Sequence, residues 1–536
     1  MRRHRARLIA ALAAGAVTTL ALSGCTLIEE IQTLGTAGPT DSAGATEGPV
    51  DADVAPELRE FYEQELEWGE CPPERAAPEE YECATLSAPM DWNDPAAHEP
   101  IELALIRLPA SGESQGSMFT NPGGPGASGV DFVAGAGTTF FSAELQANYD
   151  IVGWDPRGVG ASSAVECRDD AGMDEHFYGV PEGWSQMSDE EKLQASIQEQ
   201  IRFGADCLTN TGDLLGFVDT RSTVRDLDMM RAVVGDDLLT YFGLSYGTDI
   251  GAQYIDMFPE RVGRIVLDGA TDPTVPAFDV ILDQQEKFGD ATRTYLEDCI
   301  ATPGCPFRSK DVDGAIEEIR TIMDEVDASL PKGPDGRTLT SGVISTAISA
   351  AMYDESSWAY LSQAFKLWYE SADPSYFFLL SDTYFGRDMN GHYDSNMFEA
   401  FSAINCLDYP LVTDAATIRA FNEKLKEVSL FGGATTEAEM EIGDVTCENW
   451  PVPPRVTEQK PVVGAGAAPV LVVATTNDPA TPLKWAEAVA EQLESGVLVV
   501  YEGEGHIAYD EGDKCLMGTV DDYFVEGKVP DDKVTC

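Results

Sequence analysis

The sequence predicts an α/β fold in which a mostly parallel sheet has helices on both faces and carries a large helical cap. Short strands that are apolar along their length alternate with helical segments in 57–271, and this pattern returns in 464–536. Strands of this kind belong to parallel sheets that are covered on both faces. Between them, 272–463 is rich in helical periodicity and poor in strand signals. We therefore expect a core in two parts, with the cap inserted before the last two strands.

The predicted elements follow one another in the order that such a core requires. Before the cap, strands are expected over 101–108, 117–120, 149–154, 238–242 and 264–267, and helices over 223–234 and 246–258. The cap should contain helices over 281–299, 312–326, 341–352, 357–371 and 416–428. After the cap, strands are expected over 469–474 and 497–501, with a helix over 483–493 between them. About 480 ordered residues exceed a single simple core, which is a second reason to expect an inserted domain.

The first 24 residues form a predicted secretory signal peptide, because a basic start is followed by an apolar run over 8–22 and by small residues. That run is too short to span a bilayer, which needs roughly 20 residues. Cys25 follows Leu-Ser-Gly, which resembles the lipobox of bacterial lipoproteins and implies cleavage before Cys25 and attachment of lipid to it. An ordinary signal peptide with a chance cysteine is the alternative. We expect an exported protein, anchored by lipid on Cys25 to the outer face of the membrane, with 25–56 as a flexible tether.

The chain is strongly acidic, with a formal net charge of −59. Removal of the signal peptide takes four arginines and no acidic residue with it, which makes the charge −63. Such a surface argues against nucleic acid as a partner. Solubility or adaptation to salt explains the charge, and attraction of cationic groups such as peptide amino termini is the alternative.

The cysteine count indicates disulfides. Eleven cysteines less Cys25 leave an even number in an exported chain, where disulfides are the default. No C-x-x-C motif occurs and there are only five histidines, so we expect neither a metal site nor another cofactor. Sequential pairing closes the shorter loops and is our preference: Cys71–Cys83, Cys167–Cys207, Cys299–Cys305, Cys406–Cys447 and Cys515–Cys536.

The segment 243–247 reads G-L-S-Y-G and follows a predicted strand directly. A serine on a sharp turn from strand to helix sits in strained backbone, so the residues two positions away on each side must be small. Ser245 is therefore a candidate nucleophile. A glycine-rich connection with a structural serine is the alternative that this pentapeptide leaves open.

A serine nucleophile needs a base, normally a histidine oriented by a carboxylate. His506 follows the last predicted strand in a glycine-rich segment, and Asp478 lies at the tip of the strand before it. Either residue alone is better explained as structural. Together they place serine, aspartate and histidine in the chain order of an α/β-hydrolase, each at the end of a parallel strand. We predict a catalytic triad of Ser245, Asp478 and His506.

Acyl transfer also needs hydrogen-bond donors for the developing oxyanion. The backbone N–H of Tyr246, next after the serine, is one candidate. The glycine-rich loop over 121–126 follows a predicted strand and should supply the other, from Gly124 or, as the second choice, from Gly123. A phosphate-binding loop is the alternative, but no Gly-Lys-Ser/Thr follows.

Five motifs together carry a family resemblance: G-G-P-G at 123–126, W-D-P-R-G-V-G-x-S at 154–162, G-x-S-Y-G-T at 243–248, N-D-P-A-T-P at 477–482 and G-x-G-H at 503–506. They resemble the prolyl aminopeptidase-related serine peptidases, and most of all the secreted tripeptidyl aminopeptidases of actinobacteria, over nearly all of 72–536. The histidine that usually precedes G-G-P-G in prolyl aminopeptidases is replaced here by Asn121-Pro122, which argues against a strict proline iminopeptidase.

The resemblance implies removal of short peptides, tripeptides by analogy, from the free amino termini of peptides or proteins. An esterase or lipase would use the same triad, and a binding lipoprotein on a hydrolase scaffold is the alternative without activity. We expect a monomer.

An aminopeptidase must hold an ammonium group, and carboxylates of the cap are the natural means. If Cys406 and Cys447 pair, they bring Asp408 and Glu448 together, which makes these two acids our candidates. Solvated acids without a binding role are the alternative.

Four other polar residues near strand ends have structural interpretations. Asp155, Arg157 and Asp268 are expected to brace turns and loops. Thr481 either hydrogen-bonds to the carboxylate of Asp478 or caps the helix that follows it.

Overall fold

The computed structural model describes residues 54–73, 77–434, 436–509, 512–531 and 533–536. The predicted signal peptide, Cys25 and nearly all of the predicted tether lie outside these ranges. Within them, no helix combines the length and the apolar character needed to cross a bilayer.

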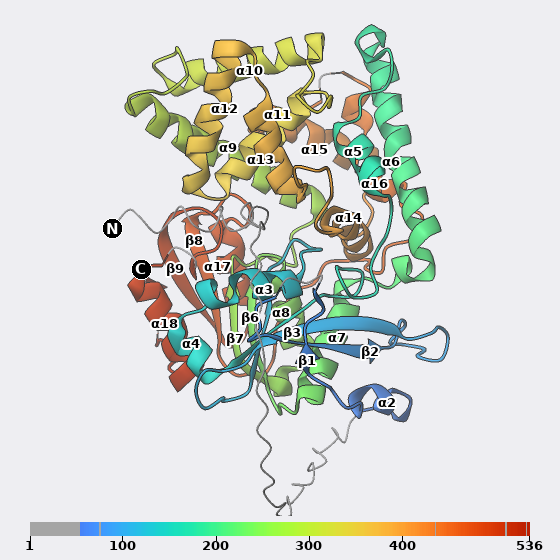
Figure 1. Cartoon of the computed structure of the whole chain (residues 1–536), viewed down its shortest axis with the longest axis vertical. Coiled ribbons are helices and arrows are strands. Elements are labelled where there is room, and N and C mark those ends of the chain that lie inside the picture. Colours follow the sequence, from blue (N-terminus) through green and yellow to red (C-terminus); the bar gives the residue numbers. More distant parts are fainter. Residues whose placement is uncertain (1–53, 74–76, 435, 510–511, 532) are drawn as a thin grey trace, which may run out of the picture.

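A single sheet of ten strands forms the centre of the lower half of the molecule in Figure 1. The strand order is β1-β2-β3-β5-β4-β6-β7-β8-β9-β10. The strands from β5 to β10 are mutually parallel, whereas β1, β2 and β3 pair in antiparallel fashion. Their bounds are β1 Gly69–Glu70, β2 Glu82–Ala88, β3 Ile101–Leu108, β4 Ser117–Asn121, β5 Asp150–Trp154, β6 Leu239–Leu244, β7 Val262–Asp268, β8 Val470–Asn477, β9 Gly496–Glu504 and β10 Val534–Thr535.

Helices cover both faces of this sheet, and successive strand residues feed two separate cores. In β6, Tyr241 belongs to one core and Phe242 to the other, as the alternation of side chains along a strand requires. The first core includes α7 (Thr220–Val234), α8 (Gly247–Met257) and α17 (Leu483–Gln492). The second includes α3 (Gly129–Phe140), α4 (Ala143–Asn148) and α18 (Lys514–Glu526). The chain has the α/β-hydrolase fold.

The cap lies above the sheet in Figure 1 and has a third core of its own. Its helices are α9 Ala277–Ala301, α10 Val312–Ser329, α11 Ser341–Met352, α12 Trp358–Ser371, α13 Ser375–Phe385, α14 Met397–Asp408, α15 Ala415–Val428 and α16 Val445–Glu448. Helix α14 is different, because its apolar face packs into the first core of the sheet rather than into the cap core. It therefore joins the two halves of the molecule.

A second segment, from within 57–271, also lies in the upper half. Helices α5 (Asp170–Tyr178) and α6 (Asp189–Thr211) stand beside α14 and α16 (Figure 1). Tyr178 belongs to the cap core, and Arg387 pairs with Asp174 at 2.6 Å. The prediction that 57–271 is all core did not foresee this, because the few apolar residues of α6 gave no hint of the surface on which it packs.

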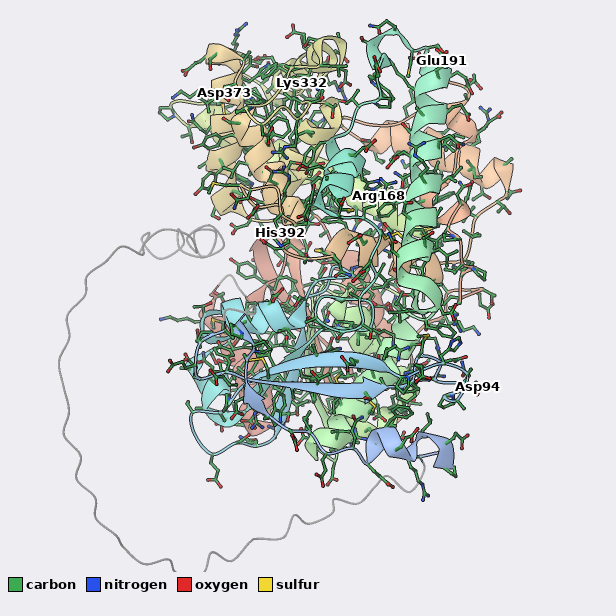
Figure 2. The ribbon with its side chains drawn as sticks, turned by 45° about the vertical axis from the view of Figure 1, so that its right-hand side comes forward. Asp94, Arg168, Glu191, Lys332, Asp373 and His392 are labelled. Carbon is green, nitrogen blue, oxygen red and sulfur yellow. A yellow bond between two sulfur atoms is a disulfide. The ribbon has the colours of Figure 1, made fainter. Side chains whose placement is uncertain are left out.

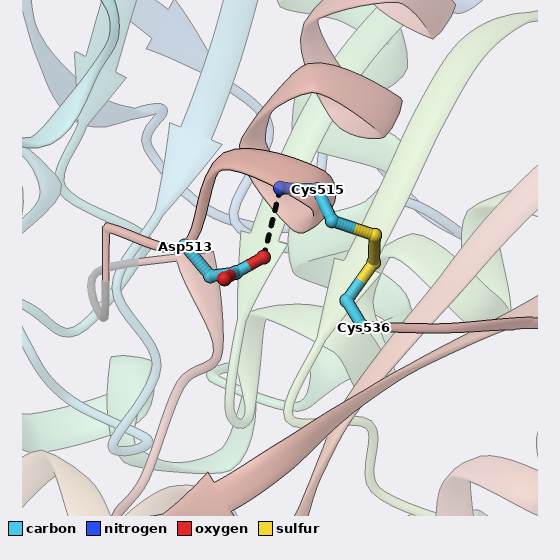
Figure 3. Close-up of side chains that lie close together, drawn as sticks. All are labelled: Asp513, Cys515 and Cys536. Carbon is cyan, nitrogen blue, oxygen red and sulfur yellow. Dashed lines mark hydrogen bonds between the residues drawn. A yellow bond between two sulfur atoms is a disulfide. The ribbon is translucent and has the colours of Figure 1, made fainter.

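The described cysteines form five disulfides, and they join the same sequential pairs that the sequence analysis preferred. Figure 3 shows the one nearest the end of the chain, where Asp513 accepts a hydrogen bond of 2.8 Å from the N–H of Cys515. Cys515 is bonded to Cys536, so neither sulfur is a thiolate that could ligate a metal. Asp513 serves there as the N-cap of α18.

Each predicted strand of the core is present, and the helix predicted over 341–352 is α11 with the same bounds. Several elements were not predicted. Among them are β2, whose small and polar residues hide its alternation, and α14, whose apolar face became evident only against the core. The others include the helices α3, α4, α5, α6, α13 and α18.

We predict that loss of one partner from the buried ion pair of Arg157 and Asp226 is strongly destabilising. Both side chains are fully buried, and Arg157 donates to the two carboxylate oxygens at 2.7 and 2.6 Å. Arg157→Met should lower the free energy of unfolding by about 3–5 kcal/mol, because it leaves a buried charge unpaired. The exposed pair of Arg293 and Asp313 provides the control, and Arg293→Met should cost no more than about 1 kcal/mol. Urea titration of both variants measures the difference, and equal losses would contradict the prediction.

Candidate active site

Ser245 occupies the turn between β6 and α8, and its backbone is strained. Its φ is 54°, in the left-handed region that residues other than glycine rarely adopt. The flanking glycines are required by close approach: a methyl group on Gly243 would lie 2.5 Å from the carbonyl oxygen of Gly247, and one on Gly247 would lie 2.4 Å from that of Asn121. This is the geometry that the sequence analysis inferred from the spacing of the two glycines.

Asp478 and His506 meet at the tips of β8 and β9. The Nδ1 atom of His506 lies 2.8 and 3.0 Å from the two carboxylate oxygens of Asp478. Asp478 is almost fully buried and also accepts the N–H groups of Ala480 and Thr481, each at 2.9 Å. The hydroxyl of Thr481 donates to the second oxygen at 2.9 Å, which is the first of the two roles considered for this residue. A proton held on Nδ1 by this carboxylate leaves Nε2 as the basic nitrogen.

Burial and charge act in opposite directions on the pKa of His506. Burial by itself lowers this pKa, but the adjacent carboxylate of Asp478 and the more distant one of Asp268 more than offset burial. The pKa therefore lies above the ordinary value of 6.5. An imidazole with this environment is well suited to accept a proton and to hold it while charge develops nearby.

The turn of Ser245 and the ring of His506 both lie close to the end of β7. The N–H of Ser245 donates to the carbonyl of Asp268 at 2.9 Å, and a methyl group on the next residue, Gly269, would lie 3.2 Å from Cε1 of His506. Within the described residues no hydrogen bond joins the Ser245 hydroxyl to His506. Such bonds are often long in hydrolases without substrate and tighten when it binds.

Two contacts hold the loop that carries His506. The carboxylate of Asp268 accepts the N–H groups of Ala508 and Tyr509 at 3.0 and 2.8 Å, and burial raises the pKa of Asp268 to about 6. On the cap side, the N–H of His506 donates to the carbonyl of Tyr353 at 3.0 Å, and the two rings meet edge to face at 5.5 Å. Asp268 thus braces a loop as expected, whereas Tyr353 was not foreseen.

The glycine-rich loop lies against the serine. A methyl group on Gly123 would come within 2.8 Å of Cβ of Ser245 and 3.0 Å of the backbone nitrogen of Tyr246. The N–H of Gly123 already donates to the side-chain oxygen of Asn121 at 3.0 Å. The N–H groups of Gly124 and Tyr246 have no acceptor among the described residues. This arrangement favours Gly124 over Gly123 as the second oxyanion donor.

Neighbouring residues support this loop from both sides. Asp155 accepts the hydroxyl of Ser128 at 2.5 Å, and burial raises the pKa of Asp155 to about 6. On the cap side, a methyl group on Gly126 would lie 2.3 Å from the carbonyl oxygen of Met397, so the first turn of α14 presses on the loop. Asp155 is therefore a brace, in line with the sequence analysis.

Asp408 and Glu448 lie in different surroundings. Asp408, at the end of α14, accepts the N–H and hydroxyl of Thr220, and the hydroxyl of Thr220 contacts that of Tyr246. Burial, with Asp219 close by, raises the pKa of Asp408 well above its ordinary value. Glu448 is exposed, and its carboxylate lies against Gly443. Although Cys406 and Cys447 are bonded, the structure does not bring the two acids together, and their role in ammonium binding stays a prediction.

Proteins of similar sequence include enzymes named as serine proteases and esterases. A family model described as TAP-like protein matches residues 434–536. Serine protease Hip1 of Mycobacterium tuberculosis is 35% identical over 492 residues, which cover 88% of this chain and 91% of that protein. The chain belongs to this TAP-like family of serine hydrolases. Carboxylesterase B of Mycobacterium tuberculosis is 34% identical, with 93% and 94% covered, and tripeptidyl aminopeptidase of Streptomyces lividans is 28% identical, with 88% and 86% covered.

Solved structures resemble the TAP-like chain only loosely. An α/β hydrolase fold protein from Chitinophaga pinensis is 11% identical, with a TM-score of 0.34, and the match covers 85% of this chain and 99% of that one. A hydrolase from Pseudomonas aeruginosa is 13% identical, with a TM-score of 0.32 and coverage of 80% and 97%. The fold assignment rests on the sheet order and the helix layers described above.

Sequence analysis missed the contributions that the cap makes to this TAP-like site. Tyr353 and Met397 contact the histidine loop and the glycine loop, but neither lies in a motif or near a strand end. Thr220, at the start of α7, likewise lies in no motif that pointed to the site. Met397 could have been found by a rule that the ends of cap helices lie above the strand ends, because α14 begins at this residue.

We predict that hydrolysis of a neutral aryl ester falls as the pH drops through an apparent pKa above 6.5. His506 must be neutral to accept a proton, so a raised pKa moves the acid limb of the kcat/KM profile to higher pH. Asp268→Asn removes one of the charges that raise this pKa and should move the acid limb to lower pH. Circular dichroism should show that the variant is folded. An acid limb that stays in place, or moves to higher pH, would contradict this assignment.

Proposed function

We propose that the chain is an exported, lipid-anchored serine exopeptidase that releases short peptides, tripeptides by analogy, from free amino termini. One observation carries the catalytic part of the proposal: Asp478 and His506 form a hydrogen-bonded pair at adjacent strand tips, near the strained turn of Ser245. Acyl transfer needs a nucleophile, a base, a carboxylate that orients the base, and hydrogen-bond donors for the oxyanion. The triad provides the first three, and the loop containing Gly124 provides an oxyanion donor.

In the mechanism that this geometry supports, the hydroxyl of Ser245 attacks the scissile carbonyl while Nε2 of His506 takes its proton. The tetrahedral oxyanion accepts hydrogen bonds from the N–H groups of Tyr246 and Gly124. His506 then gives the proton to the leaving amine, and an acyl-enzyme remains on Ser245. Water, activated by the same histidine, releases the acyl peptide. Asp478 stays ionised and stabilises the imidazolium through both transfers.

Peptides are favoured over esters as substrates by the acidic chain, which suits cationic amino termini, and by a cap large enough to restrict entry to the end of a chain. Two of the relatives are named a serine protease and a tripeptidyl aminopeptidase. A carboxylesterase is the second candidate function, because another relative of equal similarity carries that name. The loop that begins Asn121-Pro122 lacks the histidine usual in prolyl aminopeptidases, which argues against a proline iminopeptidase. The replacement does not change the oxyanion chemistry, because the donor from this loop is a backbone N–H.

We predict that peptide-arylamide hydrolysis depends on Ser245 and on a free amino terminus. Ser245→Ala should lower kcat by about 10⁴-fold or more and abolish labelling by a fluorophosphonate probe, because the nucleophile is lost. Acetylation of a tripeptide-arylamide should lower kcat/KM in the wild-type enzyme far more than acetylation changes an ester of the same acid. Ser222→Ala is the matched control for the serine change, because the hydroxyl of Ser222 donates at 2.8 Å to Asp219, the N-cap of α7. A preference for simple esters, with indifference to acetylation, would overturn the peptidase assignment in favour of a carboxylesterase.

We predict that Cys25 carries the membrane anchor. Cys25→Ser should move the enzyme from the membrane fraction to the medium or to the soluble fraction, because a protein without lipid lacks the apolar chains that hold it at the bilayer. Fractionation with an activity assay measures the shift, and intact mass of the mature protein reports the lipid. A wild-type enzyme without lipid mass would refute the anchor and leave the catalytic proposal intact.

A further inference from the structure

A cavity of about 280 Å³ lies at the lower side of the cap, between α5, the end of α13 and the first turn of α14. Its lining combines three phenylalanines and a tyrosine with a buried carboxylate: Phe177, Phe385, Phe398, Tyr393 and Glu399. Arg168 and His392, which Figure 2 labels near the junction of cap and core, mark the two segments between which it lies. The catalytic residues proposed above are not part of its lining.

Glu399 is the one feature of this lining that points to a ligand. Its side chain is buried, with an exposed fraction of 7%. One oxygen, Oε1, accepts the N–H groups of Cys167 and Arg168 at 2.6 and 3.0 Å. The other oxygen, Oε2, has no donor among the described residues. Burial raises the pKa of Glu399, so a cation that fills the cavity would stabilise the charged form of this carboxylate.

Two other charged residues of the lining, Arg168 and Asp170, are already paired. Arg168 donates to Glu199 at 2.5 Å and to Asp206 at 2.8 Å, and so its charge is matched by two acids. Asp170 lies 3.0 Å from Nδ1 of His392. Asp169 also lines the cavity without an ion pair, but it is exposed and accepts the N–H of Gly172 as the N-cap of α5. Glu399 is the buried acid of the described lining without an ion-pair partner, and the local balance favours a cationic ligand over an anionic one.

The aromatic walls suit an organic cation. Phe177 and Phe385 stack at 4.0 Å, and Phe398 meets them edge to face at 5.7 and 4.9 Å. Tyr393 adds a fourth ring, 5.8 Å from Phe177. Aromatic faces attract ammonium and guanidinium groups, and they also cover the methylene groups of such ligands. A hydrated inorganic cation would gain nothing from this apolar surface.

Two observations connect the cavity to the proposed catalytic site. The first turn of α14 carries both Met397, which presses on the glycine loop, and Glu399, which lines the cavity. A row of ring contacts also leads from His506 through Tyr353 and Tyr384 to Phe398, with centroids 5.5, 6.2 and 5.3 Å apart. Helix α14 therefore contacts both the cavity and the loop that contains Gly124.

We propose that this cavity, with Glu399 at its base, is the subsite that binds a cationic group of the peptide substrate. The ligand is an alkylammonium or guanidinium, supplied either by the free amino terminus or by a basic side chain near it. The inference rests on the proposed peptidase function and assigns to Glu399 the charge recognition that the sequence analysis sought in Asp408 and Glu448.

The test compares three tripeptide-arylamides that differ in their first residue: norleucine with a free amino group, acetylated norleucine and acetylated lysine. An advantage for the free amine identifies the amino terminus as the ligand, and one for acetylated lysine identifies the side chain. In Glu399→Gln the advantage of the cationic substrate, as a ratio of kcat/KM values, should fall by about tenfold or more. Glutamine keeps an acceptor for the two N–H groups of the loop, so the fold should survive.

Glu318→Gln is the matched control, because Glu318 also accepts two backbone N–H groups of a cap loop but does not line this cavity. Its ratio should equal that of the wild type. Loss of kcat/KM by one common factor for all three substrates in Glu399→Gln would make Glu399 merely structural and overturn the inference, as would an unchanged ratio.

Failure of the peptidase proposal is separable from failure of the subsite. If the wild-type enzyme hydrolyses none of the arylamides, binding of benzylamine hydrochloride still tests the cavity through the melting temperature. A rise in Tm with benzylamine in the wild type and in Glu318→Gln, absent in Glu399→Gln, supports the cation site. No rise in the wild type, or the same rise in all three proteins, contradicts it.

Discussion

The two loops that must meet for acyl transfer are joined through one buried residue, Asp268, at the end of β7. Its carbonyl accepts the N–H of Ser245, and its carboxylate accepts those of Ala508 and Tyr509, just beyond His506. Because β7 lies between β6 and β8 in the parallel part of the sheet, this anchor is as rigid as the core itself. The strain at Ser245 can persist because such contacts over-determine the turn.

The cap is attached to this centre by more than its two chain connections. Asn396, before α14, donates its side-chain amide to the carbonyls of Gly158 and Val165, and Met397 presses on the glycine loop. At the other end of α14, Asp408 receives the hydrogen bonds of Thr220, and Cys406 is bonded to Cys447. The helix therefore couples the placement of the cap to the loop that should hold the oxyanion. A change in the position of the cap would therefore alter the oxyanion loop through packing contacts rather than through charge.

The catalytic half of the site could be predicted because its requirements are local. A strained turn needs glycines at two fixed positions, and residues at the ends of parallel strands gather at one edge of the sheet whatever lies between them in sequence. These rules bring Asp478 and His506 to Ser245 across a cap of nearly two hundred residues. The choice between Gly123 and Gly124 was beyond such rules, because it depends on which N–H Asn121 already occupies.

The sequence by itself determined the central strands of the core, their order along the chain, and the residue types at the strand ends, since hydrophobic periodicity and backbone strain are properties of short segments. Only the tertiary structure decided which neighbours surround each acidic side chain. Asp408 and Glu448 were chosen for their nearness to two cysteines, yet Asp408 contacts Thr220 whereas Glu448 is exposed, and Glu399 lies on a helix that was not predicted. Helices α5 and α6 likewise pack against the cap although α7, β6, α8 and β7 lie between them and the first cap helix in the chain. The physical reason is the same in each case: the environment of a charged side chain is set by its neighbours in space, and periodicity records only its neighbours in the chain.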